Sequence, residues 1–90
     1  MKKKWFDLIA SGDKTVEYRE FKPHWKKRLL DVSGDTKKFD EIYFKNGYNK
    51  NAPFMRVKFG TIQIMPVNGI YCFCIILGKV LEVIKHEREM

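Results

Sequence analysis

The run from Ile70 to Leu77, with the sequence IYCFCIIL, constrains the fold of this chain more than any other segment. Every residue in it is apolar, so a strand formed here would present apolar side chains on both of its faces. Such a strand belongs in the interior of a sheet that is covered on both sides. Asn68 and Gly69 come directly before the run, and this pair is typical of a tight turn between two antiparallel strands.

The segment before this turn predicts a second strand, which is bent. Met55, Val57 and Phe59 alternate toward one face, whereas Ile62 and Ile64 continue out of phase with them. A slip of one residue beside a glycine is typical of a β-bulge, and a bulge bends a strand. The remaining predicted strands cover residues 14–19, 39–45 and 79–85.

The predicted strand 14–19 alternates between two kinds of side chain. Val16 and Tyr18 fall on one face, and Glu17 and Arg19 fall on the other. We therefore expect a half-buried strand, with the Val16 face turned inward and the Glu17 face turned toward solvent.

Two short helices are predicted, one on each side of this strand. The first covers residues 4–11, carries an apolar stripe that includes Trp5, and ends at Gly12 as at a C-terminal cap. The second begins at Pro23, which suits the first turn of a helix, and runs to about Asp31. The expected fold is α+β, a small mixed β-barrel of about five bent strands with two short helices. An open α+β sandwich is the alternative.

Length and charge limit the classes of function. A chain of 90 residues is expected to form one domain, residues 1–90, because two cores would each be too small to hold together. Its 18 Lys and Arg residues against 11 Asp and Glu give a net charge of +7, which favours a polyanionic partner. No apolar run approaches the ~20 residues of a membrane span, and the N-terminus lacks the apolar stretch of a signal peptide. We expect a cytoplasmic protein with no membrane partner.

Cys72 and Cys74 stand two residues apart in the apolar run. In a strand their side chains point the same way at a separation of about 6.5 Å, the far edge of disulfide reach. We interpret them as buried, reduced thiols, which fits a cytoplasmic location. A metal half-site at these cysteines would lack nearby Cys or His partners, and His24 and His86 are isolated. The sequence therefore predicts neither a metal site nor a cofactor.

The stretch SGDKTVEYRE, residues 11–20, contains the spacing G-x-K-x-x-E-x-R. Lys14 and Arg19 supply donors for phosphate oxygens or a base edge. Glu17 would orient Arg19, or accept a hydrogen bond from a nucleobase. The alternative is a plain ion pair on a strand face beside a solvated lysine.

This spacing resembles the signature of the ASCH family, which has a PUA-like fold. Two later segments, residues 39–44 and 75–82, are similar to strands of the same family. The resemblance implies a PUA-like barrel with a cleft near the motif, which in this family is proposed to bind RNA. Family members usually begin with an apolar strand, but only residues 1–4 precede Trp5 here. One edge of the barrel would then be open, and a homodimer would cover it.

Some members of this family hydrolyse the amide of acylated cytidine with a lysine and a threonine three residues later. Lys14 matches the lysine, but Glu17 occupies the position of the threonine. Lys14 and Glu17 are thus candidate catalytic residues only if Glu17 activates a water with Lys14 as its electrostatic partner. Metal-dependent ribonuclease activity is also ascribed to a relative. The sequence leaves open whether this chain catalyses a reaction.

Two further groups are candidates for contacts with a nucleic acid. Lys26 and Lys27, in the predicted second helix, form a basic patch with Arg28 that would hold backbone phosphates, unless it is simply a solvated helix face. Tyr48, in the polar loop 46–53, would stack on a base, unless the loop is an ordinary connector. Both tryptophans lie on apolar helical stripes and are interpreted as core residues.

Three functions therefore remain open. The favoured one is a binding module for RNA or a nucleotide-like ligand, with a basic cleft around the motif. The second is a small hydrolase acting on a modified nucleoside, such as an acylated cytidine, or on RNA. The third is an interaction domain whose basic face meets an acidic protein.

Overall fold

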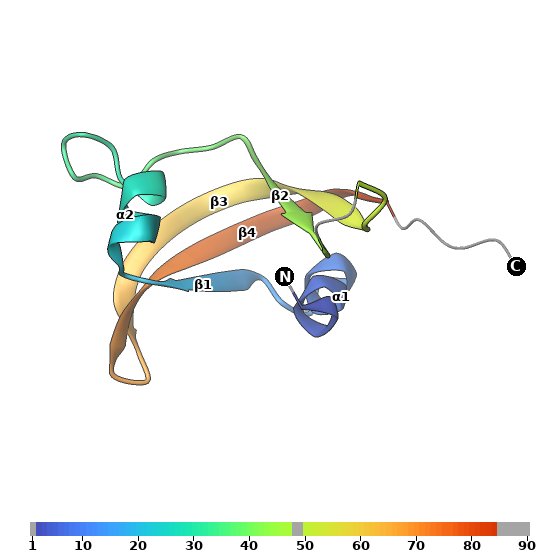
Figure 1. Ribbon diagram of the computed structural model, residues 1–90, viewed down its shortest axis with the longest axis horizontal. Coiled ribbons are helices and arrows are strands. Elements are labelled where there is room, and N and C mark those ends of the chain that lie inside the picture. Colours follow the sequence, from blue (N-terminus) through green and yellow to red (C-terminus); the bar gives the residue numbers. More distant parts are fainter. Residues whose placement is uncertain (1, 48–49, 85–90) are drawn as a thin grey trace, which may run out of the picture.

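The computed structural model describes residues 2–47 and 50–84. Two helices and four strands follow one another in the order α1 (Lys3–Ser11), β1 (Val16–Glu20), α2 (Pro23–Leu29), β2 (Glu41–Lys45), β3 (Phe54–Val67) and β4 (Ile70–Ile84). The strands form one antiparallel sheet in the order β1-β4-β3-β2 (Figure 1). The predicted α+β class with two short helices is confirmed.

The long hairpin of β3 and β4 forms the middle of the sheet. Asn68 and Gly69 make its turn with φ angles of 51° and 80°, the left-handed values that such a turn requires. Strand β4 pairs with β1 on one side and with β3 on the other. The prediction that the apolar run 70–77 is a central strand is therefore confirmed.

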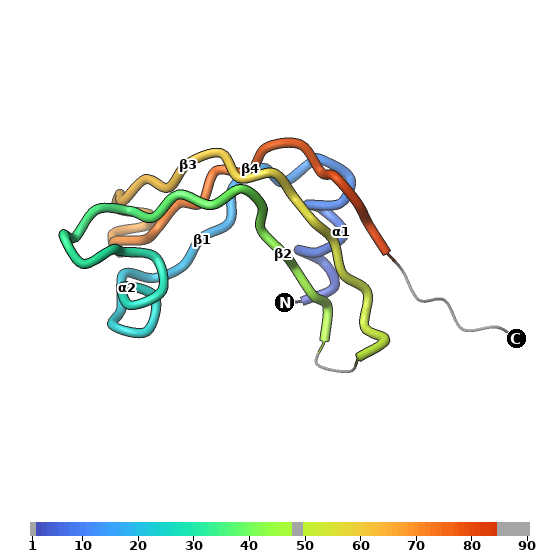
Figure 2. The backbone as a smooth tube through the Cα atoms, turned by 90° about the horizontal axis from the view of Figure 1, so that it is seen from above, coloured from blue at the N-terminus to red at the C-terminus, as the bar shows by residue number. Residues whose placement is uncertain are grey.

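The hairpin bends where the sequence predicts a bulge. The register between β3 and β4 shifts three times between Arg56 and Thr61. A Cβ atom on Gly60 would lie 2.6 Å from the carbonyl oxygen of Ile76, so a larger residue would push the strands apart at this point. Figure 2 shows the result, an arch with α2 inside one arm and α1 inside the other.

The core lies on the inner face of this arch. Along β4 the side chains of Phe73, Ile75 and Leu77 share one parity and all belong to it. The buried cluster consists of Phe6, Ile9, Leu29, Phe44, Met55, Val57, Ile62, Phe73, Ile75 and Leu77. Cys72 and Cys74 have the opposite parity, and both are free and buried, as predicted. Burial raises the pKa of the Cys74 thiol, and repulsion from Cys72 adds to the shift.

Four strands are present where about five were predicted. The segment 79–85 was expected to be a separate strand, but up to Ile84 it continues β4, because pairing with β3 resumes at Val80 beyond Gly78. In the described part of the chain the sheet is not closed into a barrel. The two outer strands lie at opposite ends of the hairpin, since β1 pairs with residues 72–76 and β2 with residues 54–58. They are thus too far apart along the hairpin to pair with each other.

The helices also differ in detail from the prediction. Helix α1 buries Phe6 and Ile9, while Trp5 is 41% exposed. Helix α2 ends at Leu29, earlier than predicted, and Val32 beyond it is fully exposed. Within residues 2–47 and 50–84, neither helix is long and apolar enough to cross a membrane.

Candidate functional site

Glu17 and Arg19 lie on the inner face of the sheet. The register pairs Glu17 with Ile75 and Arg19 with Phe73, and both partners are core residues. Glu17 is only 7% exposed, whereas Tyr18 is 44% exposed. The predicted alternation is correct, but the two faces are exchanged, so the expectation that Glu17 faces solvent is wrong.

A buried carboxylate needs partners, and the motif supplies them. Oε1 of Glu17 lies 3.1 Å from Nη1 of Arg19 and 3.9 Å from Nζ of Lys14. The same oxygen accepts a hydrogen bond of 3.0 Å from the backbone N–H of Tyr18. Because a buried charge is tolerated only when it is paired and hydrogen-bonded, these contacts explain how Glu17 can lie inside. The three charged residues of the motif are therefore brought together, around a carboxylate that serves to position them.

Lys14 is held away from the rest of the site. Its ammonium nitrogen lies 5.3 Å from the ring centroid of Trp5 and 5.1 Å from that of Tyr18. Such cation–π contacts, together with Glu17, account for the low exposure of its side chain, 16%. Lys14 thus joins α1 to β1, and its contacts are those of a structural residue.

Arg19 points the other way and connects the motif to α2. Its guanidinium carbon lies 5.1 Å from the ring centroid of Trp25, and its Nη1 donates to the backbone carbonyl of Tyr18. The guanidinium of Arg28 lies 6.0 Å from the same indole centroid. Two arginines thus share one aromatic ring, and Glu17 holds the first of them in place.

A cleft of about 370 Å³ opens beside these arginines, between α2, the segment around Phe39 and the inner face of the sheet. We call it the aromatic cleft. Its lining consists of Arg19, Trp25, Arg28, Leu29, Phe39, Glu41, Ile42, Tyr43, Phe59, Ile62 and Ile75. This is an apolar floor with a few polar groups at its margin, the usual composition of a ligand site.

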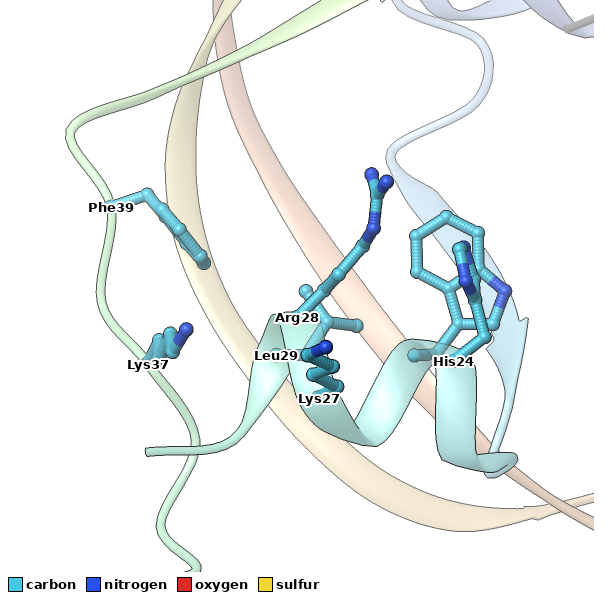
Figure 3. A pocket seen from close by; sticks show the side chains of 7 residues that line it. His24, Lys27, Arg28, Leu29, Lys37 and Phe39 are labelled. Atoms are coloured by element: carbon cyan, nitrogen blue, oxygen red, sulfur yellow. The ribbon is translucent and has the colours of Figure 1, made fainter. Parts of the chain in front are cut away.

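A second hollow of about 660 Å³ adjoins the aromatic cleft, and we call it the basic groove. It is lined by His24, Trp25, Lys27, Arg28, Leu29, Lys37 and Phe39. In Figure 3, Lys37 and Phe39 project from the chain after α2 toward the helix, and Arg28 reaches past the helix toward the sheet. Because Arg28 and Phe39 line both hollows, the cleft and the groove are neighbours.

Glu41 is the one carboxylate in the aromatic cleft, and its charge is already matched. It forms a salt bridge with Arg56 and accepts a hydrogen bond of 3.0 Å from the hydroxyl of Tyr43. The hydrogen bond from Arg56, followed by that from Tyr43, holds the pKa of Glu41 below its usual value. The hydrogen bond that the Tyr43 hydroxyl donates to Glu41 raises the pKa of Tyr43, so its phenol stays neutral. The cleft therefore presents net positive charge to a ligand.

The structure separates the predicted binding residues. Arg19 lines the aromatic cleft and Lys27 lines the basic groove. Lys14 and Glu17 line neither, and the ammonium of Lys26 lies over the ring of Phe21 at 4.3 Å. The candidate stacking residue, Tyr48, lies outside the described residues.

Two residues of the site, Trp25 and Phe39, were misread or missed from the sequence. Trp25 was interpreted as core, yet it lines both hollows. Arg28 stands three residues after Trp25 in α2, and this helical spacing places both side chains on one face. The spacing was the signal in the sequence that Trp25 lies beside a cation. Phe39 precedes β2 and gave no signal, because only the fold brings it opposite α2.

The described residues include no group of three or more His, Cys, Asp or Glu side chains arranged to hold a metal ion. Carboxylates are scarce around both hollows, and Glu41 is bound to Arg56. Comparison of the chain with models of protein families, with curated proteins and with solved structures gave no match.

Proposed function

We propose that this chain binds RNA or a nucleotide-like ligand, with a base in the aromatic cleft and phosphate at the cations beside it. One observation carries the proposal: Arg19 and Arg28 approach the same indole, that of Trp25, at the margin of an apolar cleft. An apolar cleft beside two guanidinium groups suits a ligand that is aromatic at one end and anionic at the other.

The aromatic cleft has the means to hold a base. Phe39 and Tyr43 line it and are 39% and 66% exposed, so part of each ring is available for stacking. Stacking of a base on an aromatic side chain contributes about 1–3 kcal/mol. The volume of about 370 Å³ lies within the range of small-ligand sites.

The arginines have the means to hold phosphate. A guanidinium presents a fork of donors that matches two phosphate oxygens. Glu17 fixes Arg19 before any ligand arrives, which lowers the ordering cost of binding. The net charge of +7 would draw a polyanion toward this site.

The contacts of Glu17 favour binding over hydrolysis. Its Oε1 already faces Arg19, Lys14 and the N–H of Tyr18. A general base must instead reach the proton that it removes. Glu17 is thus better suited to position Arg19 than to activate a water on an acylated cytidine.

We also propose that the chain is related to the ASCH family. The support is that the G-x-K-x-x-E-x-R residues converge, and that Arg19 links them to a cleft. A PUA-like barrel would need a further strand to join the outer edges of β1 and β2. A second copy of the chain would supply one in a homodimer, which sedimentation analysis would detect.

The proposal is tested with oligouridine RNA and a pair of matched variants. Arg28→Ala removes a cation from both hollows, whereas Lys79→Ala removes the same charge from an exposed position that lines neither. We expect the Kd of the first variant to rise about tenfold and that of the second less than about twofold. Equal losses in the two variants would mean that only the net charge attracts RNA, and the proposed site would be wrong.

A further inference from the structure

The basic surface continues beyond the basic groove. A third hollow of about 630 Å³ lies along α2 and the turn that follows it. It shares Lys27 and Lys37 with the basic groove and adds Lys26. The basic groove in turn shares Arg28 with the aromatic cleft. Because neighbouring hollows share lining residues, the three hollows are contiguous. We call the three together the basic track.

The cations of the track are available to a ligand. Among the described residues, neither Lys27 nor Lys37 has a carboxylate within salt-bridge distance. Asp31 also lines the third hollow and stays ionised, but in the part of the chain that the structure describes it forms no ion pair with these lysines. Its Oδ1 accepts hydrogen bonds from the N–H and hydroxyl of Ser33 and from the N–H of Asp35.

The extent of the track is larger than a single nucleotide requires. The phosphate of one nucleotide in the aromatic cleft would be satisfied by Arg19 and Arg28. Lys26 and Lys27 of the third hollow directly precede Arg28 in α2, and Lys37 lies beyond the helix. Adjacent residues on a helix about 10 Å across with its side chains project in different directions. A chain of phosphates would use both groups of cations at once.

We infer that the ligand is a single strand of RNA, with one base in the aromatic cleft and the adjoining phosphates along Lys27 and Lys37. This inference rests on the proposed function and narrows it from nucleotides in general to an oligonucleotide. A duplex would present phosphates to the lysines but would keep its bases stacked and paired, out of reach of the cleft.

The test compares ligand lengths by calorimetry on the full chain. The ligands are uridine 5′-monophosphate, oligouridine of five nucleotides and an RNA duplex. The proteins are the wild type, the double variant Lys27→Ala/Lys37→Ala, and the control Lys58→Ala/Lys79→Ala. The control loses the same charge from two exposed residues outside the track. Thermal unfolding of each variant shows that it is folded before it is titrated.

We expect the five-nucleotide strand to bind at least about tenfold more tightly than the monophosphate. The double variant should lose about tenfold in affinity for the strand and less than about twofold for the monophosphate. The slope of log K against log salt should fall in magnitude by about 1.4, which corresponds to two phosphate contacts on a single strand. The control should retain most of its affinity for both ligands.

Three results would overturn the inference, and they are distinguishable. Equal affinity for the monophosphate and the strand would make the ligand a single nucleotide, and the proposed function would survive. A duplex that binds as tightly as the strand would show that the aromatic cleft takes no base. If neither the strand nor the monophosphate binds at about 1 mM, the proposed function fails together with the inference.

Discussion

The two arms of the arch use their arginines in different ways. In the arm that holds α1 and β2, Arg56 is matched by the carboxylates of Glu41 and Glu82. In the arm that holds α2 and β1, Arg28 lies beside an indole and, within the part of the chain described, has no carboxylate within salt-bridge distance. The α1 arm thus has its arginine paired on both sides, whereas the α2 arm holds one paired arginine, Arg19 with Glu17, and, among the described residues, one that lies only beside an indole, Arg28. This difference fits the proposal that the ligand binds in the α2 arm.

The packing of the two arms supports the same division. In the α1 arm Phe6, Ile9, Met55 and Val57 are at most 1% exposed. A hollow of about 490 Å³ beside α1 and Val83 has no basic residue among the described residues that line it. The α2 arm instead leaves aromatic rings and cations at the margins of its hollows.

The largest effect is expected from Phe6→Ala in the α1 arm. This change removes a ring that is 1% exposed and should lower the free energy of unfolding by about 3–5 kcal/mol. The substitution Val32→Ala, at a fully exposed residue after α2, is a surface control and should change it by less than about 0.5 kcal/mol. Urea unfolding followed by circular dichroism measures both. Similar losses in the two variants would mean that Phe6 does not contribute to a packed core.

Glu17→Gln should affect stability and binding together. The substitution keeps the shape of the side chain but removes the charge that Arg19 and Lys14 share, which we expect to cost about 1–2 kcal/mol, allowing for the partial exposure of Arg19. RNA affinity should fall as well, because Arg19 is no longer fixed beside Trp25. The control is Glu20→Gln in the same strand, where the glutamate is exposed. A Glu17→Gln protein with normal affinity would show that Arg19 needs no positioning.

Arg28→Ala and Arg56→Ala should have opposite profiles. The first should raise the Kd for oligouridine about tenfold and change stability by less than about 0.5 kcal/mol. The second should lower the urea midpoint, because Glu41 and Glu82 lose their shared partner. It should raise the Kd less than Arg28→Ala does, because it leaves Glu41 unmatched in the cleft but removes no cation from the cleft lining. Parallel titrations and unfolding curves give both quantities. If Arg56→Ala weakened RNA binding as much as Arg28→Ala, the cations that line the cleft would not be the groups that hold the ligand.

The smallest effect is a pH dependence in the α1 arm. Arg56 and Tyr43 lower the pKa of Glu41 in the folded chain below its usual value of 4.5. Glu41 therefore adds stability that is present above about pH 4.5 and is lost as the pH falls through the lower folded pKa. Glu41→Gln should lower the urea midpoint at pH 7 and flatten its decline on acidification. If the urea midpoint of Glu41→Gln declined with acidification as it does in the wild type, other groups would cause the acid sensitivity. Asp31 would be one of them, since its pKa is also lowered.

The parts of the fold that local signals control were predictable. Asn68 and Gly69 set the turn, the apolar run after them set the central strand, and Gly60 marked the bend. The number of strands was overestimated because Gly78 looks like a boundary in the sequence but lies within a single strand, β4, whose pairing with β3 resumes at Val80. Whether a sheet closes depends on where its outer strands pair, which no local pattern determines.

The site was only partly predictable for a related reason. The motif residues do converge, but alternation within a short strand shows only that two faces differ, and which face is buried is decided by the rest of the sheet. The pairing of Glu17 with Arg19 was expected from the sequence. The carboxylate was nevertheless assigned to solvent, because charged side chains are usually exposed and the short strand does not show which face the sheet buries. Phe39 reaches the cleft through tertiary contacts alone.

The two tryptophans allow the most direct test, because Trp5 belongs to the α1 arm and Trp25 to the α2 arm. Their indole N–H signals, assigned with Trp5→Phe, can be followed in ¹H–¹⁵N spectra while oligouridine is added to the wild-type chain. We predict that the Trp25 signal shifts to saturation and that the Trp5 signal stays in place. A shift of Trp5 alone, or of neither signal, would contradict the assignment of binding to the α2 arm.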